Sequence, residues 1–270
     1  MRTTFSVSRP PRAPRVRARV RRWAVLGALL GAGLSLWLFA PARWLAAAVA
    51  QASQGQVQLQ GARGSVWNGS AQLVLTGGRN SRDATALPGR LHWRIRPDWR
   101  GATLALWPDC CARQPLQVTV QAGWQRVRVA VGNHQSEWPT SLLQGLGAPW
   151  NTLQLDGQLQ LAFEDYAVQW VQGRVLMQGQ VQASLRHASS SLTTLRPMGS
   201  YRLIMQGEEA VTLSLVTDAG PLLLQGQGQW TGQRLRFQGQ ASAQPEHLPA
   251  LSNLLSLMGR RDGPRAILSF

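Results

Sequence analysis

The stretch RLHWRIR, residues 90–96, shows the alternation that decides the fold. Leu91, Trp93 and Ile95 take every second position, and charged or polar side chains take the positions between them. Successive side chains of a strand point to opposite faces, so a period of two predicts a strand with one apolar and one wet face. Such strands are typical of antiparallel sheets.

The same period recurs along most of the chain after residue 56. The other segments that show it are 69–75, 124–131, 155–163, 175–185, 222–230 and 235–241. Turn residues such as Asn68-Gly69 and Asp156-Gly157 separate them, and Asn68-Gly69 is a candidate two-residue hairpin. Glycines inside strands, such as Gly226 and Gly239, predict bulges or strong curvature. The predicted fold is therefore mainly β: a large curled antiparallel meander, with one transmembrane helix before it.

Helical patterns are short. Residues 44–54 predict a small amphipathic helix after the membrane segment, and residues 141–146 predict one or two turns. Apolar residues at spacings of three and four in 248–258 predict a helix that covers one end of the sheet. The Ser/Thr-rich stretch 184–200 predicts a loop or a mobile hairpin tip. The last residues, 267–270, predict an edge strand.

The N-terminus combines basic charge with an apolar run. Residues 1–22 hold eight arginines and no acid, which is half of the net charge of +16. Residues 23–40 carry no charge, and as a helix they would cover about 27 Å, close to the hydrocarbon thickness of a bilayer. The pattern predicts three parts: a cytoplasmic basic tail (1–22), a transmembrane anchor (23–42) and a periplasmic β-rich domain (43–270). The expected location is a Gram-negative inner membrane, crossed once.

Two alternatives bear on this segment. A cleavable signal peptide would need a small-residue site, and Ala40-Pro41-Ala42 and Ala48-Val49-Ala50 both fit; the long apolar core and the proline favour an uncleaved anchor. The spacing of Gly27 and Gly31 is a candidate helix-packing site, although lipid also tolerates small residues there. Next to a span, the arginines favour anionic lipid over nucleic acid as the partner of the tail.

Residues suited to catalysis are scarce. All 28 basic residues are arginine, and the four histidines lie in separate segments. No nucleophile elbow, zinc-protease, paired Cys-x-x-Cys or phosphate-loop motif is present. The acidic pairs Glu164-Asp165 and Glu208-Glu209 are predicted at turns. We therefore expect no enzyme activity, no cofactor, no metal and no small-molecule substrate.

The adjacent Cys110 and Cys111 are the only cysteines. An oxidising periplasm favours disulfides, but the Cα atoms of neighbouring residues lie closer than disulfides usually require. A vicinal disulfide, two free thiols, and an intermolecular bridge or metal contact all stay open.

Two stretches, residues 61–71 and 91–97, carry a family resemblance. The matching residues are an exit proline, a G-x-x-W-x-G-x-A signature and a W-x-x-x-P strand: Pro41, Gly64, Trp67, Gly69, Ala71, Trp93 and Pro97. With them the chain resembles the type II secretion system protein N family, a general secretion pathway component. The resemblance gives these residues a structural role, in which Trp67 locks the first hairpin and Gly69 allows its turn.

The resemblance implies a non-enzymatic inner-membrane component of the machinery that exports folded proteins across the outer membrane. Its role would be accessory, in assembly or as a scaffold, and its partners would be other secretion subunits. A curled sheet could bind such a subunit by strand addition or on its concave face. The alternative is a lipid-binding or lipid-transfer groove, as in AsmA-like proteins, with the apolar face open to acyl chains.

Overall fold

The computed structural model describes residues 16–79, 81–148, 150–208, 210–231 and 234–269. The chain divides into two compact units, residues 1–40 and Pro41–Phe270. Most of the predicted basic tail, residues 1–15, lies outside the described residues.

In the described residues of the first unit there is one helix, α1 (Val16–Leu38). From Trp23 onward its side chains are exposed, including Trp23, Leu29 and Leu30 at 74%, 66% and 72%. Among the described residues, no helix combines the length and the apolar character that crossing a membrane requires. The predicted span 23–42 is also divided, because α1 ends at Leu38 and the extended backbone of Pro41 begins a second helix, α2 (Ala42–Ala52).

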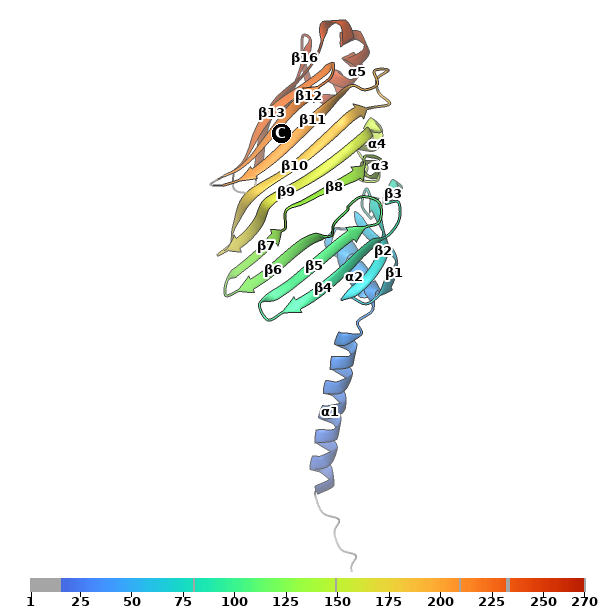
Figure 1. Ribbon diagram of the computed structural model, residues 1–270, viewed down its shortest axis with the longest axis vertical. Coiled ribbons are helices and arrows are strands. Elements are labelled where there is room, and N and C mark those ends of the chain that lie inside the picture. The colour runs from blue at the N-terminus through green and yellow to red at the C-terminus, as the bar shows by residue number, and fades with distance from the viewer. Residues whose placement is uncertain (1–15, 80, 149, 209, 232–233, 270) are drawn as a thin grey trace, which may run out of the picture. The chain divides into compact units, whose positions relative to one another are not determined.

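The second unit is built on one antiparallel sheet (Figure 1). Its described strands are β1 Val57–Gly64, β2 Asn68–Thr76, β3 Ala84–Ala86, β4 Leu91–Asp98, β5 Gly101–Pro108, β6 Leu116–Gly123, β7 Arg126–Val131, β8 His134–Pro139, β9 Asp156–Val171, β10 Arg174–Ser189, β11 Gly199–Gly207, β12 Val211–Ala219, β13 Leu222–Thr231, β14 Arg234–Ala243, β15 Arg260–Asp262 and β16 Arg265–Ser269. The path runs β1-β2-β4-β5-β6-β7-β9-β10-β11-β12-β13-β14-β16-β15, while β3 pairs with β2 and β8 with β9. The predicted mainly β fold with a large antiparallel meander is confirmed.

Three local predictions are wrong. β10 continues to Ser189 and β11, which pairs with it, begins at Gly199, so the predicted bounds 184–200 of the loop or hairpin tip are too wide. Residues 184–189 are strand because Leu185 still pairs with Leu159, and cross-strand packing outweighs Ser/Thr composition. The C-terminal strand β16 is not an edge, since it pairs with both β14 and β15. Glu164-Asp165 lies inside β9, not at a turn, where the pairing register shifts.

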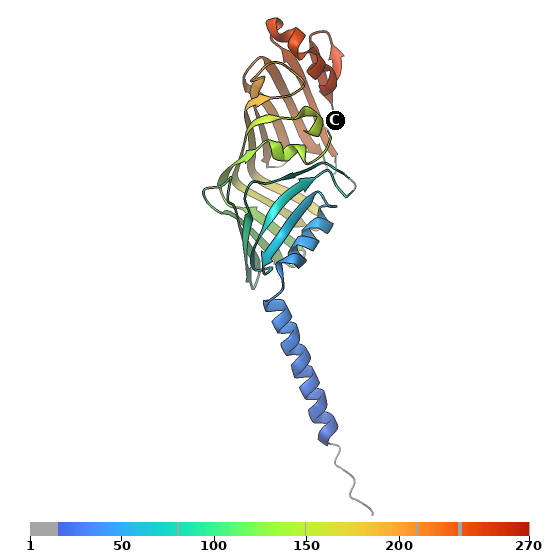
Figure 2. The ribbon, with the colours of Figure 1, turned by 90° about the vertical axis from the view of Figure 1, so that its right-hand side faces the viewer.

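Short helices lie against one face of the sheet. They are α2, α3 (Ser141–Gln144), α4 (Trp150–Leu153), η1 (Pro245–His247) and α5 (Leu248–Met258). Figure 2 looks onto the face that α3, α4 and the segment before β11 cover. Ser190 in that segment donates its hydroxyl to the carbonyl of Leu153 at 2.6 Å. The helices therefore cover the apolar side that the alternation predicted.

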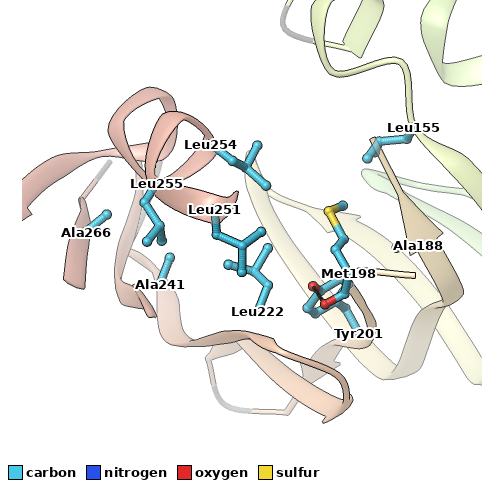
Figure 3. Packing of buried hydrophobic residues seen from close by; sticks show 10 residues of the cluster. All are labelled: Leu155, Ala188, Met198, Tyr201, Leu222, Ala241, Leu251, Leu254, Leu255 and Ala266. Atoms are coloured by element: carbon cyan, nitrogen blue, oxygen red, sulfur yellow. Dashed lines mark hydrogen bonds between the residues drawn. The ribbon is translucent and has the colours of Figure 1, made fainter. Parts of the chain in front are cut away.

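The largest cluster of buried side chains lies under α5 (Figure 3). Leu251, Leu254 and Leu255 of the helix are at most 2% exposed and pack with Leu222 of β13 and with alanines of β14 and β16. Small residues on the strands let the helix approach closely. Two smaller clusters lie under α2 and beside α3.

The opposite, wet face carries ladders of amides. Gln225 pairs with Gln240, and Gln227 with Gln238, on β13 and β14. Neutral amides avoid the repulsion that like charges in register would cause. On the covered face, the ring of Phe237 occupies the space that a side chain at Gly226 would need.

The helix α5 provides a matched test of this core. Leu255 is fully buried, whereas Leu257 on the same helix is 64% exposed. We expect Leu255→Ala to lower the free energy of unfolding by about 2–5 kcal/mol, because it leaves a cavity. Leu257→Ala should stay within about 0.5 kcal/mol of the wild type. Urea unfolding of the full chain measures both, and equal losses would contradict the assignment of the α5 face.

Candidate functional site

The second unit begins beside the β1–β2 turn, at a part of the sheet that we call the corner. Pro41 forms an isolated antiparallel bridge with Ser65. The amide of Ser65 donates to the carbonyl of Asn68 at 2.9 Å, and the Ser65 hydroxyl accepts from the Asn68 amide at 3.1 Å. The turn therefore spans 65–68, and Gly64 and Gly69 form the last strand pair. The Asn68-Gly69 turn prediction is wrong, because these two residues already pair with β4.

Trp93 fills the interior of this corner. It is 1% exposed, and its indole Nε1 donates to the carbonyl of Val66 at 3.1 Å. A Cβ at Gly69 would lie 2.6 Å from Trp93 Cζ2 and 2.6 Å from the carbonyl oxygen of Arg63. Gly69 is thus needed for close approach, and Ala71, also fully buried, belongs to the same cluster.

The other signature residues lie around this contact or beyond it. The carbonyl of Trp67 accepts from the amide of Ile95 at 2.7 Å, which ties the turn to β4. Gly64 has a φ of +88°, a region that L residues rarely adopt. Pro97 lies further along β4, opposite Ala102 near the β4–β5 turn. Pro41, Gly64, Trp67, Gly69, Ala71 and Trp93 therefore share one corner, and Pro97 does not.

A second cluster surrounds Asp109, and the sequence reasoning missed it. One carboxylate oxygen accepts from the amide of Arg90 at 3.0 Å, and the other lies 3.1 Å from Nε2 of His92. The His92 ring stacks on Trp107, with centroids 5.9 Å apart. His92 and Trp107 share the wet face because they pair across β4 and β5. Only the pairing register of β4 and β5 could have revealed the contact between His92 and Trp107.

Asp109 precedes the two cysteines, which the structure joins in a disulfide. Cys111 is 7% exposed and packs with Leu87 and with Leu142 of α3. Its carbonyl accepts from the amide of Glu137 at 2.9 Å. The disulfide therefore belongs to the loop that joins β5 to β6, and this loop packs against α3 and β8.

Burial causes the pKa shifts of the titratable groups in this unit. Burial raises the pKa of the Tyr201 phenol, whose hydroxyl donates to the carbonyl of Met198 at 3.2 Å. Burial lowers the pKa of His134. In the part of the chain that the structure describes, no three His, Cys, Asp or Glu side chains lie close enough to hold a metal ion.

One part of the covered face has no helix over it. Val127, Trp170 and Val175 are direct cross-strand neighbours on β7, β9 and β10. They are 39%, 42% and 58% exposed. This apolar row is a candidate contact surface.

Comparison with known proteins gives one match. A family model described as "Type II secretion system (T2SS), protein N" matches residues 55–268. No curated protein and no solved structure matches the chain. The matched range holds every signature residue except Pro41, which lies before it.

The close contact at Gly69 predicts the effect of adding one methyl group. Gly69→Ala should lower the free energy of unfolding by about 1–3 kcal/mol, since either Trp93 or the Arg63 backbone must move. The control is Gly132→Ala, where the new Cβ would lie 3.6 Å or more from its nearest neighbours and should have an effect within about 0.5 kcal/mol. Urea unfolding followed by tryptophan fluorescence compares them. A Gly69→Ala chain as stable as the control would contradict the packing requirement.

The redox state of the cysteine pair can be tested by alkylation followed by a measurement of the intact mass. We expect iodoacetamide to leave the chain unmodified after purification without reductant, and to add two groups only after reduction. Intact-mass spectrometry distinguishes these results. Alkylation without reductant would show free thiols instead.

Proposed function

The chain belongs to the type II secretion system protein N family, and from this premise we propose that it is a non-enzymatic, inner-membrane-anchored component of that secretion machinery. The family places it among the secretion components of the Gram-negative envelope, with other secretion subunits as its partners. The observation that carries the proposal is the length of the match, which spans nearly the whole sheet. The proposed role is accessory: assembly or scaffolding for export across the outer membrane.

Strand addition at β1 is the proposed mode of contact. β1 and β15 are the two ends of the strand path in the described sheet, while β3 and β8, which also pair with one strand each, lie off this path. β15 is three residues long and consists of Arg260, Arg261 and Asp262. Short, charged edges are typical of protection against pairing. β1 has eight residues, of which only Arg63 is charged, and therefore suits an added strand better.

Attachment to the membrane through residues 23–42 is part of the proposal, with residues 43–270 in the periplasm. Support comes from the exposed apolar side chains of α1 from Trp23 onward, since a lipid or protein environment would stabilise apolar side chains that cover a helix surface. The arginines of the 1–22 tail suit the cytoplasmic side and anionic lipid. A Cβ at Gly27 or Gly31 would meet no atom within 4 Å, so this face could receive a second helix.

The proposal predicts cross-links from β1 to secretion subunits. A photo-reactive benzoylphenylalanine at Gln60, which is exposed on β1, should cross-link an inner-membrane secretion subunit in cells. The same residue at Arg261, exposed on β15, is the control and should not. Gentle detergent purification of the tagged full chain, with mass spectrometry of proteins and lipids, should enrich secretion subunits from both membranes.

Two results would count against the proposal. Cross-links from position 261 but not 60 would overturn the choice of edge and keep the scaffold role. Purification without any secretion subunit, from cells with an active secretion system, would overturn the role itself.

A lipid groove is the second candidate, favoured by the exposed row of Val127, Trp170 and Val175. Apolar side chains aligned across three strands could contact acyl chains. The same purification tests it, because stoichiometric phospholipid without secretion subunits would favour the groove.

A further inference from the structure

Three hairpin tips lie together along one edge of the sheet. Alternate turns of an antiparallel meander fall on the same edge, so the β4–β5, β6–β7 and β9–β10 turns are neighbours there. The pairing agrees, since Gly101 lies opposite Gln121, and Arg126 opposite Val171. The β1–β2 turn, which Pro41 contacts, is on this edge too. We call residues 98–101, 123–126 and 171–174 the tip edge.

The tip edge contains a pocket rich in arginine. Its volume is about 390 Å³, and its lining includes Arg100, Arg126 and Arg128 with Gln121 and Gln169. None of the acidic side chains that the structure describes lines it. Among the described residues, none of the three guanidinium groups forms an ion pair. The nearby carboxylate of Asp98 accepts from the amide of Trp99 at 2.8 Å and so stabilises its own turn.

The pairing register explains why the arginines converge. Arg128 lies between Gln121 of β6 and Gln169 of β9 in one cross-strand row. Arg126 lies in the next row toward the tips, two residues away on the same strand face. Arg100 reaches the pocket from the β4–β5 turn, where its guanidinium carbon is 4.0 Å from the ring centroid of Trp99. Three arginines lining one pocket repel one another, and a bound anion would lower that repulsion.

Large aromatic side chains project from the same edge. Trp99 is 80% exposed and Trp124, at the β6–β7 tip, is 94% exposed. On the other face of the same strands lies the exposed row of Val127, Trp170 and Val175. Indole rings with arginines beside them are typical of the membrane interface, where rings enter the headgroup layer and guanidinium groups reach phosphates.

We propose that the tip edge binds the surface of a membrane that contains anionic phospholipid, with a headgroup phosphate in the arginine pocket and Trp99 and Trp124 in the interface. The inference rests on the proposed membrane attachment and adds a second contact, made by the β domain. Charge complementarity selects this occupant: the pocket is lined by three guanidinium-bearing side chains, and exposed indole rings lie on the turns beside it. A soluble phosphate would use the pocket but would leave the two indoles in water.

The test measures lipid contact at the tip edge of the full chain in nanodiscs. A thiol-reactive nitrobenzoxadiazole label at Gln125→Cys reports on the β6–β7 tip, and the same label at Ala219→Cys reports on the opposite edge. With phosphatidylglycerol in the nanodisc, lipids that carry a headgroup-level doxyl quencher should quench label 125 and leave label 219 unquenched. The wild-type chain treated in the same way reports any labelling of Cys110 and Cys111.

Charge variants test the pocket. Arg126→Gln with Arg128→Gln should lower the ratio of docked to undocked tip by roughly 30-fold, since each arginine near an anionic surface contributes about fivefold. In this double variant, quenching of label 125 should fall to the level seen for the chain with both arginines in nanodiscs made of phosphatidylcholine alone. The matched control, Arg260→Gln with Arg261→Gln, removes the same charge from β15 and should keep the quenching.

Each other outcome overturns the inference in a recognisable way. If neither label 125 nor label 219 is quenched although the chain elutes with the nanodisc, docking of the tip edge is overturned. The proposed membrane attachment through residues 23–42 is then unaffected. Quenching of label 125 that is independent of phosphatidylglycerol and of the arginines overturns the headgroup site. A chain that does not elute with the nanodisc overturns both the attachment and the docking, and leaves the cross-links to secretion subunits as a separate result.

Discussion

The structure depends on one constraint: a large single sheet has one apolar face, and little helix is available to cover it. Strands with alternating side chains place their apolar residues on the same face, strand after strand. α2 covers one buried cluster, Leu142 of α3 belongs to a second, and α5 covers the third, against which Leu143 of α3 and Leu153 of α4 also pack. Outside these clusters the apolar row on β7, β9 and β10 stays exposed.

That incomplete cover shapes the functional interpretation. A protein with its apolar face fully buried would offer only its edges and its polar face to a partner. Here an edge strand, an exposed apolar row and a basic tip edge are all accessible in one unit. These features suit a component that contacts several surfaces in the cell envelope, which is consistent with membership of a secretion family.

Most of the meander could be predicted because alternation is a local property. The stretch 90–96 shows its apolar and wet faces from residue order alone, and the structure places Trp93 inside and Arg94 outside. The prediction for 184–200 failed because composition was judged without the pairing partner. The Asn68-Gly69 turn failed for a related reason: Gly69 is required by a ring on a strand more than twenty residues away.

The sequence by itself determined the mainly β character, the two faces of the strands that alternate clearly and the family, because these follow from neighbouring residues and short motifs. Only the tertiary structure decided which strands meet in which register. That register puts His92 beside Asp109 and Trp107, and gathers Arg100, Arg126 and Arg128 into one pocket. The physical reason is that a cross-strand contact depends on pairing between distant segments, and a shift of one residue would move every side chain to the other face.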